Sequence, residues 1–397
     1  MNATNASEVA RVAQLRGQLA EAQYDYPGAR SHYEAATRLT PADGWAHMDL
    51  ARASLMELDT GTARAELAAF AKSSKSYLVP KGQSINLSQS HLGQLLEDFE
   101  LDQSALAKLR EARAMPLADQ LPILRSVVQV HPDCMSAALA TTIALRRNGL
   151  FSGFALSAES SFKSPIPQHI VQFWDADPPP DVVDLMTSWQ QMNPQYGWTC
   201  FNDPEARRFL AQAFPLSVLQ AYNLARQAAQ KADIFRLAYL TARGGVYADA
   251  DDRCDTPLSS FLRNDATLAL HQDNFAAIGN NFIAATAEHP VLQRALSMAV
   301  TAVNRGDQDL IWLSTGPGLL TRAFAIEWAT AHEPNWLPRA QVMTLGALQR
   351  VIGVHCPVRY KKTNKHWMRA SFARRETRDS PRPRVRLAVA AATSPHP

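Results

Sequence analysis

The sequence predicts a chain in two parts, an all-helical region followed by an α/β domain. Three features lead to this prediction: an alanine- and leucine-rich stretch that repeats itself, a linker rich in serine and proline, and strands that alternate with helices after the linker. The length of 397 residues is sufficient for two or three domains. We place the helical region at 1–155, the α/β domain at 163–375 and a basic, proline-rich tail at 376–397.

The helical region contains an internal repeat. Aligning "YPGARSHYEAATRLTP" with "DTGTARAELAAFAKSS" pairs Ala29 with Ala63, a separation of 34 residues, which is the period of tetratricopeptide repeats. A further match puts Pro132 where Pro41 stands, and we expect each proline in the first turn of a helix. We therefore predict tetratricopeptide-like helical hairpins. An irregular helical bundle stays open as an alternative, because residues 75–105 depart from the pattern.

The α/β domain is expected to open with the strand "HIVQFW" (169–174), which is short, β-branched and aromatic. Helical patterns follow in "DVVDLMTSWQQM" and "DPEARRFLAQAF", the second starting at Asp203, before a proline. In "KADIFRLAYLTARGGVYADADDRC", apolar residues recur at helical spacing, Gly244 ends the helix, and "VYA" forms a strand. This alternation favours an α/β fold.

Acidic residues follow that last strand. Strand alternation would put Tyr247, Asp249 and Asp251 on one side, so the two carboxylates would converge. Converging carboxylates repel each other unless a cation lies between them, and Mg²⁺ or Mn²⁺ would leave coordination positions for a diphosphate. Asp233 and Arg236 share a face of the preceding helix and could pair or hold ligand hydroxyls. The alternative is an acidic surface turn without a ligand.

The segment "ADIFRLAYLTARGGVYADAD" resembles the sugar-nucleotide motif of glycosyltransferases with a DXD sugar-binding region. This is glycosyltransferase family 32, which includes initiating α-1,6-mannosyltransferases and is similar in its core to the glucosylating clostridial toxins. Four more segments resemble the family: "IPQHIVQFW", "NNFIAATAEHP", "STGPGLLT" and "HWMRASF". Val171 replaces a usual histidine and Phe372 a usual tryptophan, and the likeness covers roughly residues 165–372.

The resemblance implies a GT-A fold, a Rossmann-like and mostly parallel sheet that binds a nucleotide diphosphate sugar at the carboxyl ends of its strands. The catalytic residues that it implies are Asp233, Arg236, Asp249 and Asp251. The implied donor-binding residues are Trp174, Asp233, Arg236, Gly245, Tyr247, Asp249, Asn280 and Gly316. The implied metal ligands are Asp251 and Asp249, with His366 or Ser371 as a further ligand.

The activity implied by this family is transfer of a hexose, with retention of anomeric configuration, from a nucleotide diphosphate sugar to a hydroxyl group. The cofactor would be Mn²⁺ or Mg²⁺, and the acceptor a glycan, a lipid-linked sugar or a protein in the synthesis of cell-surface polysaccharide or glycoconjugates. The helical repeats offer a surface to a protein partner. A scaffold protein with an inactive transferase-like domain stays open. A dehalogenase-like phosphatase is disfavoured, because Arg253 stands where that chemistry needs a threonine.

Composition and charge argue against several other classes of protein. No run of 18 apolar residues suggests a membrane span, and no signal peptide pattern opens the chain, so we expect a cytoplasmic protein. The four cysteines lie far apart, as expected of reduced thiols. No nucleic-acid-binding module is recognisable.

Basic residues gather late in the chain, either as a solvated tail or as a patch for phosphate groups or the inner membrane face. They are Lys361, Lys362, Lys365, Arg369, Arg374, Arg375, Arg378, Arg382, Arg384 and Arg386.

Overall fold

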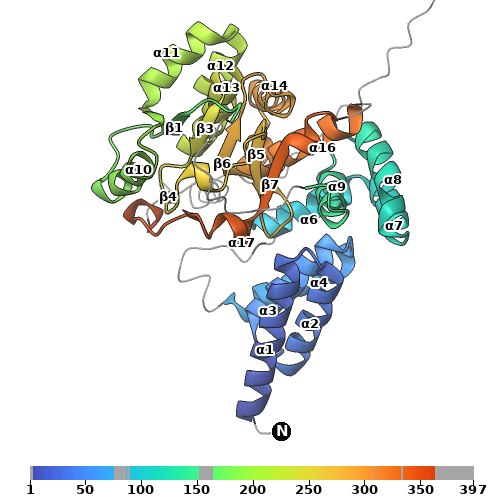
Figure 1. Cartoon of the computed structure of the whole chain (residues 1–397). Coiled ribbons are helices and arrows are strands. Elements are labelled where there is room, and N and C mark those ends of the chain that lie inside the picture. The colour runs from blue at the N-terminus through green and yellow to red at the C-terminus, as the bar shows by residue number, and fades with distance from the viewer. Residues whose placement is uncertain are drawn as a thin grey trace, which may run out of the picture.

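The computed structural model describes residues 3–75, 86, 90–151, 164–307, 309–331 and 334–362. Within these ranges an all-helical region precedes an α/β region, as the sequence predicts (Figure 1). His366, Ser371, Phe372 and the tail 376–397 lie outside the described residues.

Eight helices of the described residues form the first region (Figure 1). They are α1 (Ala3–Ala22), α2 (Tyr26–Leu39), α3 (Gly44–Met56), α4 (Thr60–Ser73), α6 (His91–Leu101), α7 (Gln103–Arg113), α8 (Leu117–Val130) and α9 (Met135–Arg147). Helices α1 and α2 pack against each other, as do α3 and α4 and, further along the chain, α8 and α9. The expected helical hairpins are therefore present.

The turns of the first two hairpins repeat at 34 residues. Asp25 accepts a hydrogen bond from the first turn of α2 at 3.2 Å, and Asp59 caps α4 in the same way at 3.0 Å. The residues before these caps, Tyr24 and Leu58, both have positive φ angles, of 59° and 63°. The same cap and the same left-handed residue thus recur one repeat apart. Assignment of the hairpins to the tetratricopeptide class stays a prediction.

The prolines of the repeats do not lie where we expected. Pro41 and Pro132 occupy the turns before α3 and α9 rather than the first helical turn. Each is the second residue of a turn closed by a backbone hydrogen bond, from Asp43 in one case and from Cys134 in the other. The fixed φ of proline suits this turn position, and the two residues that close the turns then cap the helices.

The second region is built on a six-stranded sheet with the order β2-β1-β3-β6-β5-β7. The strands and longer helices are β1 (His169–Phe173), α10 (Pro180–Met192), β2 (Gly197–Phe201), α11 (Asp203–Ala213), α12 (Leu216–Leu224), α13 (Ala228–Arg243), β3 (Gly245–Ala248), β4 (Arg253–Cys254), β5 (Leu268–Gln272), β6 (Ile278–Ala285), α14 (Pro290–Arg305), α16 (Pro317–Thr330), β7 (Ala340–Thr344) and β8 (Ile352–Gly353). Short helical turns complete it: η3 (Leu258–Ser260), α15 (Ile311–Ser314), η4 (Leu337–Arg339), α17 (Leu345–Leu348) and η5 (Arg359–Lys362).

Only β6 reverses direction within this sheet. It pairs antiparallel with β3 and β5, whereas β1 runs parallel to β2 and β3, and β5 runs parallel to β7. Five strands therefore point the same way, which confirms the expected mostly parallel sheet. Helices α13, α14 and α16 pack side by side along it (Figure 1). Helix α11 begins at Asp203, as expected, and Asn202 caps it in a capping box with Glu205.

The helical region packs directly against the sheet region. Helices α8 and α9 contact α16, and Phe151 meets Phe324 edge to face with ring centroids 5.7 Å apart. Thr142 donates a hydrogen bond to the carbonyl oxygen of Ala276 at 2.7 Å, from α9 to the loop between β5 and β6. A single cluster of buried apolar side chains includes residues of both regions. The two predicted domains thus share a hydrophobic core.

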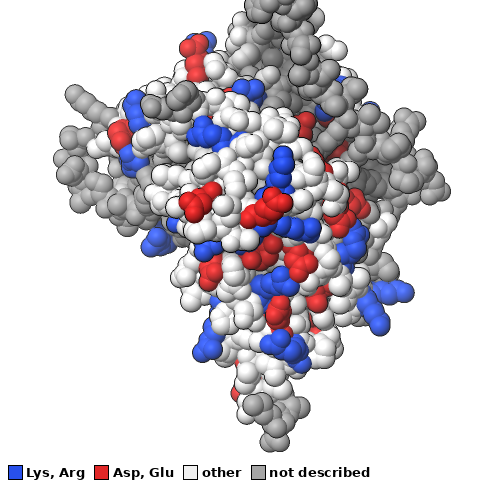
Figure 2. Space-filling model, turned by 90° about the vertical axis from the view of Figure 1, so that its right-hand side faces the viewer, with Lys and Arg blue, Asp and Glu red and all other residues white. Residues whose placement is uncertain are grey.

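Surface charges are mixed on the face that carries α7 and α8. Figure 2 shows Lys and Arg side chains interspersed with Asp and Glu there, without a broad patch of one sign. This is the pattern of an ordinary solvated surface. Among the described residues, the helices are too short or too polar to cross a lipid bilayer.

Candidate active site

Two consecutive glycines connect α13 to β3 and so set the positions of the site residues. Gly244 and Gly245 have φ angles of 65° and 107°, which residues with a Cβ rarely adopt. A Cβ on Gly245 would also lie 2.7 Å from the carbonyl oxygen of His169 in β1. The glycines therefore allow a sharp helix-to-strand connection and close packing of β3 on β1. As a result, the end of β3 lies beside the buried face of α13.

Arg236 on α13 links the acidic residues that the sequence singled out. Its guanidinium lies 3.2 Å from Oδ1 of Asp233 and 3.1 Å from Oδ1 of Asp249. It also lies over the ring of Tyr247 at 4.5 Å, and the Tyr247 hydroxyl donates to Asp249 at 3.2 Å. A further hydrogen bond runs from Arg236 to the carbonyl oxygen of Asn280. Five residues expected at the site thus form one cluster, in which Asp233, Arg236 and Tyr247 are buried.

Asp233 is held by neutral donors as well as by Arg236. Asn280 of β6 donates to one carboxylate oxygen and Thr315 to the other, each at 2.9 Å. Burial raises the pKa of Asp233 to about 6, although Arg236 acts in the opposite direction. Gly316 follows Thr315 and caps α16, and a Cβ there would lie 3.0 Å from the Cα of Trp312. Thr315 is a site residue that sequence reasoning missed, although it lies inside the "STGPGLLT" segment.

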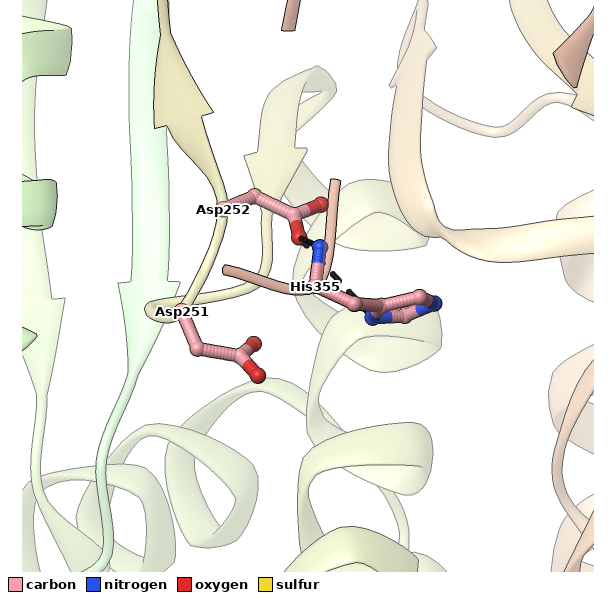
Figure 3. A group of neighbouring side chains, drawn as sticks. All are labelled: Asp251, Asp252 and His355. Carbon is pink, nitrogen blue, oxygen red and sulfur yellow. Dashed lines mark hydrogen bonds and ion pairs between the residues drawn. The ribbon is translucent and has the colours of Figure 1, made fainter. Parts of the chain in front are cut away.

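A second acidic group lies next to this cluster, in the turn after β3. Asp251, Asp252 and His355 offer ligand atoms that all lie within 4.8 Å of one another. Figure 3 shows the two carboxylates approaching His355, which comes from a separate segment of the chain. That segment is brought close because β4, just after the turn, pairs antiparallel with β8. Sequence reasoning missed Asp252 and His355 as candidate ligands.

Asp252 is fully buried and held by hydrogen bonds. The Asn281 amide donates to it at 2.5 Å, and the backbone N–H of His355 donates at 2.6 Å (Figure 3). Burial and the nearby charges of Asp249 and Asp251 hold the pKa of Asp252 well above its usual range. Such a group is costly to keep ionised without additional positive charge close to it.

Two polar side chains hold Asp251. The Tyr360 hydroxyl donates to Oδ2 of Asp251 at 2.9 Å, and the Lys361 ammonium lies 2.6 Å from the same oxygen. Both residues belong to the segment after β8, like His355. This segment therefore supplies an imidazole, a phenol and an ammonium group to the acidic turn.

The donor set around Asp251 suits a divalent ion. Two carboxylates and an imidazole are ligands that Mn²⁺ accepts, and carboxylates also suit Mg²⁺. Asp249 is directed elsewhere, because Arg236 and Tyr247 contact its Oδ1. Strand β3 ends at Ala248, so strand alternation does not extend to the two DXD carboxylates. The turn instead groups Asp251 with Asp252 and His355.

A pocket of about 340 Å³ opens beside these groups. Trp174, at the end of β1, lines it together with Trp198 of β2 and Met186 of α10. The ring of Trp174 contacts Tyr360 edge to face at 5.2 Å, so the pocket adjoins the acidic turn. Trp198 also donates to Gln172, which in turn donates to the carbonyl oxygen of Asp249 at 3.3 Å. An aromatic pocket of this kind can accept a planar ring.

Trp174 follows the carboxyl end of β1 and the acidic turn follows that of β3, and these two strands are parallel neighbours, so both groups lie at one edge of the sheet. Ligands of open α/β sheets bind at this edge. The fold and the site together define an α/β domain with a polar site at the carboxyl edge of its sheet. Residues 179–269 match the family model described as "Glycosyltransferase sugar-binding region containing DXD motif".

The chain is also similar to fungal mannosyltransferases. The chain is 29% identical over 179 residues to inositol phosphoceramide mannosyltransferase 1 of Schizosaccharomyces pombe, covering 43% of this chain and 54% of the relative. It is 31% identical over 108 residues to the initiation-specific alpha-1,6-mannosyltransferase of Saccharomyces cerevisiae, covering 25% and 22%. The chain spans about half the length of the first of these, and less of the second.

A solved structure titled "PaToxG Glycosyltransferase" is also similar. Its sequence identity is 17% and its TM-score 0.36, with coverage of 59% of this chain and 96% of that one.

Proposed function

We propose that this chain is a metal-dependent retaining glycosyltransferase that moves a hexose from a nucleotide diphosphate sugar to a hydroxyl acceptor. The observation that carries the proposal is the meeting of three groups at one sheet edge. They are the cluster around Arg236, the acidic turn with Asp251, and the pocket beside Trp174. A nucleotide diphosphate sugar needs sites for the same three parts: a sugar, a diphosphate and a base.

Each group matches the chemistry of one part of the donor. The tryptophan pocket would take the base by stacking against Trp174. Asp233 and Arg236 would bind sugar hydroxyls, since a carboxylate accepts and a guanidinium donates. Asp251, Asp252 and His355 would hold Mn²⁺ or Mg²⁺, with Asp249 turned toward the ribose or sugar. When bound, the ion supplies positive charge opposite the diphosphate.

Transfer with retention does not require a strong base in this arrangement. The site residues would fix the donor so that the acceptor hydroxyl approaches the same face from which the diphosphate leaves. Buried charges such as Arg236 are already oriented, so little reorganisation is needed when charge develops. Positioning and electrostatics therefore account for the chemistry that we propose.

Mannose is the first donor sugar to test, because the named relatives are mannosyltransferases. We include synthesis of cell-surface polysaccharide or glycoconjugates in the proposal, with a glycan, lipid-linked or protein acceptor. We also place the protein in the cytoplasm, peripheral to the inner membrane face, because its late sequence is rich in Lys and Arg. The competing proposal is a scaffold protein that binds no donor.

The proposal is tested by ligand-induced stabilisation. A ligand that binds only the folded chain raises its unfolding temperature, so Mn²⁺ with a matching nucleotide sugar should raise it, and donor hydrolysis should follow. The Asp251→Asn variant should lose at least ten-fold in affinity for Mn²⁺, because an amide replaces a charged ligand.

Asp255→Asn is the matched control. Asp255 lies on the neighbouring segment and pairs with the exposed Arg253 rather than with the site. It should bind Mn²⁺ as the wild type does. If no nucleotide sugar in a broad panel stabilised the wild-type chain in the presence of Mn²⁺ or Mg²⁺, the scaffold proposal would replace the transferase.

A further inference from the structure

Helix α1 presents an apolar face to solvent. One face of α1 packs on the hairpin, where Ala10, Gln14 and Gly17 are buried. The opposite face carries four exposed apolar side chains at helical spacing: Val9 (40% exposed), Val12 (47%), Leu15 (49%) and Leu19 (62%). Figure 1 shows α1 at the outer end of the molecule, away from the sheet. Nothing in the described part of the chain covers this face.

Such a face is unusual at the end of a helical array. Stacked hairpins bury their apolar faces against neighbours, and an end helix normally turns a polar face to solvent. A single exposed leucine is unremarkable, but four apolar side chains aligned on one helix form a continuous patch. The patch is therefore a candidate contact surface, and its charges indicate what it contacts.

Two charged residues lie within the apolar face, and their placement is symmetrical. Glu8 precedes Val12 by four residues and Arg16 follows it by four, so both lie on the side of the helix that carries Val12. Neither makes an ion pair within the described residues. They are also eight residues apart, too far along the helix to pair with each other.

A second copy of the same face complements this pattern. If two α1 helices pack antiparallel with a twofold axis at Val12, the two Val12 side chains meet at the centre. Val9 then lies opposite Leu15 of the other copy, and Glu8 lies at the height of Arg16. The twofold axis generates each of these contacts twice. Val9, Val12, Leu15 and both charges are thus paired by one arrangement, whereas Leu19 lies opposite Asn5.

We propose that the chain forms a homodimer through antiparallel packing of α1. The contact comprises one helix from each copy, which is small beside the ~1,600 Å² of a typical stable interface. The dimer is therefore weak, with a dissociation constant in the micromolar range, on the order of 10 µM. The sheet edge with the candidate active site is on a different part of the molecule and stays accessible in the dimer (Figure 1).

Sedimentation velocity on the full chain over about 1 to 100 µM tests the proposal. We expect a monomer–dimer equilibrium for the wild type and a monomer for Leu15→Glu. Leu216→Glu is the matched control, because Leu216 on α12 is a leucine with 76% exposure outside the α1 face. It should dimerise as the wild type does. A wild type that stays monomeric at 100 µM would overturn the proposal.

Charge reversal then tests the pairing of Glu8 with Arg16. Glu8→Arg alone and Arg16→Glu alone should each weaken the dimer, because like charges would face each other twice. The double variant restores opposite charges and should recover the affinity of the wild type. A double variant as weak as the single variants contradicts the antiparallel arrangement.

A cysteine at the proposed axis tests the geometry directly. Under mild oxidation with oxidised glutathione, Val12→Cys should form a disulfide-linked dimer, because only residues at a twofold axis meet their own copies. Leu19→Cys lies away from the axis and should cross-link far less. Equal cross-linking of both variants, or none, would exclude this dimer in favour of another partner for the face.

Discussion

Lys361 forms an ion pair with Asp251, the carboxylate that we propose as a metal ligand. Its ammonium lies 2.6 Å from Oδ2 of Asp251 and donates to the carbonyl oxygen of Cys356 at 2.8 Å. Both members of this ion pair are largely shielded from solvent, with side-chain exposures of 19% for Lys361 and 10% for Asp251. An ion that binds Asp251 must therefore displace the ammonium or share the carboxylate with it. Either outcome costs free energy.

Removing this lysine should tighten metal binding. We expect Lys361→Met to raise the affinity for Mn²⁺ about ten-fold, which corresponds to about 1.4 kcal/mol for the lost competition. Titration of Mn²⁺ followed by electron paramagnetic resonance measures the affinity without any substrate. Arg359→Met is the control, since it removes a positive charge from an exposed position of the same helical turn, and the ion pair of Asp251 is with Lys361. An unchanged affinity in Lys361→Met would show that the ammonium does not compete.

The cluster around Arg236 was predictable because its members are close in sequence. Helical spacing puts Asp233 and Arg236 on one face of a helix, and the two glycines after it fold the chain back. The acidic turn was only half predictable. His355 meets Asp252 through the pairing of two short strands, and neither strand has an alternating pattern long enough to read from sequence. The spacing of DXD carboxylates also suggested a strand where the chain turns.

At the scale of elements, the loop between β5 and β6 connects the two regions. Helices of the first region surround this loop: Tyr24 donates to the carbonyl oxygen of Gln272 at 2.8 Å, and Tyr26 to that of Asn274 at 3.1 Å. Phe275 projects into the helical region and contacts His91 on α6 with ring centroids 5.1 Å apart. We predicted that the helical repeats offer a surface to a partner protein. The loop between β5 and β6 of the same chain occupies part of the surface that these repeats offer.

His91 also links the helical region to the candidate site. Its ring contacts Trp312 at 4.8 Å, and Trp312 lies just before Thr315, which hydrogen-bonds Asp233. Phe275 similarly precedes β6, the strand that carries Asn280. The helical region therefore supports the two segments that supply the neutral donors to Asp233. The sequence could not reveal this, because the contacts join residues more than 180 positions apart.

Burial of His91 makes the structure sensitive to acid. Burial lowers its pKa from 6.5 to about 4, and Nε2 has no hydrogen-bond partner among the described residues. The folded-state pKa is below the unfolded value, so between pH 6.5 and 4 the unfolded chain binds the extra proton. The stability associated with a neutral His91 is complete above pH 6.5 and declines as the pH falls.

We therefore expect His91→Phe to remove part of the acid sensitivity. Phenylalanine keeps the ring contacts and cannot bind a proton, so the variant should lose about 2 kcal/mol less stability than the wild type between pH 7 and pH 5. Urea unfolding at both pH values gives the two differences. His32→Gln, at a partly exposed position on α2, is the control. Equal losses in His91→Phe and the wild type would mean that His91 is protonated in the folded state.

At the scale of the whole molecule, the sequence predicted the order of an all-helical region and an α/β region, but it did not predict how the two regions pack. The change from helices to an α/β pattern is visible in hydrophobic periodicity, and the helical region of the structure ends at Arg147, before β1 begins at His169. Periodicity carries no information about which surfaces meet. Arg146 on α9 illustrates the difference, because it donates to Gln272, at the end of β5, and to the carbonyl oxygens of Val342 and Met343 in β7. These contacts join helix and sheet into one body.

A shared core predicts that the whole chain unfolds as one cooperative unit. Independent domains separated by a flexible linker would unfold in two steps, whereas regions joined by buried apolar contacts lose stability together. Differential scanning calorimetry should show a single transition whose calorimetric and van't Hoff enthalpies agree. Arg146→Met, which removes the bonds to β5 and β7, should lower the temperature of that transition or split it. Two separate transitions in the wild type would show instead that the interface contributes little and that each region folds on its own.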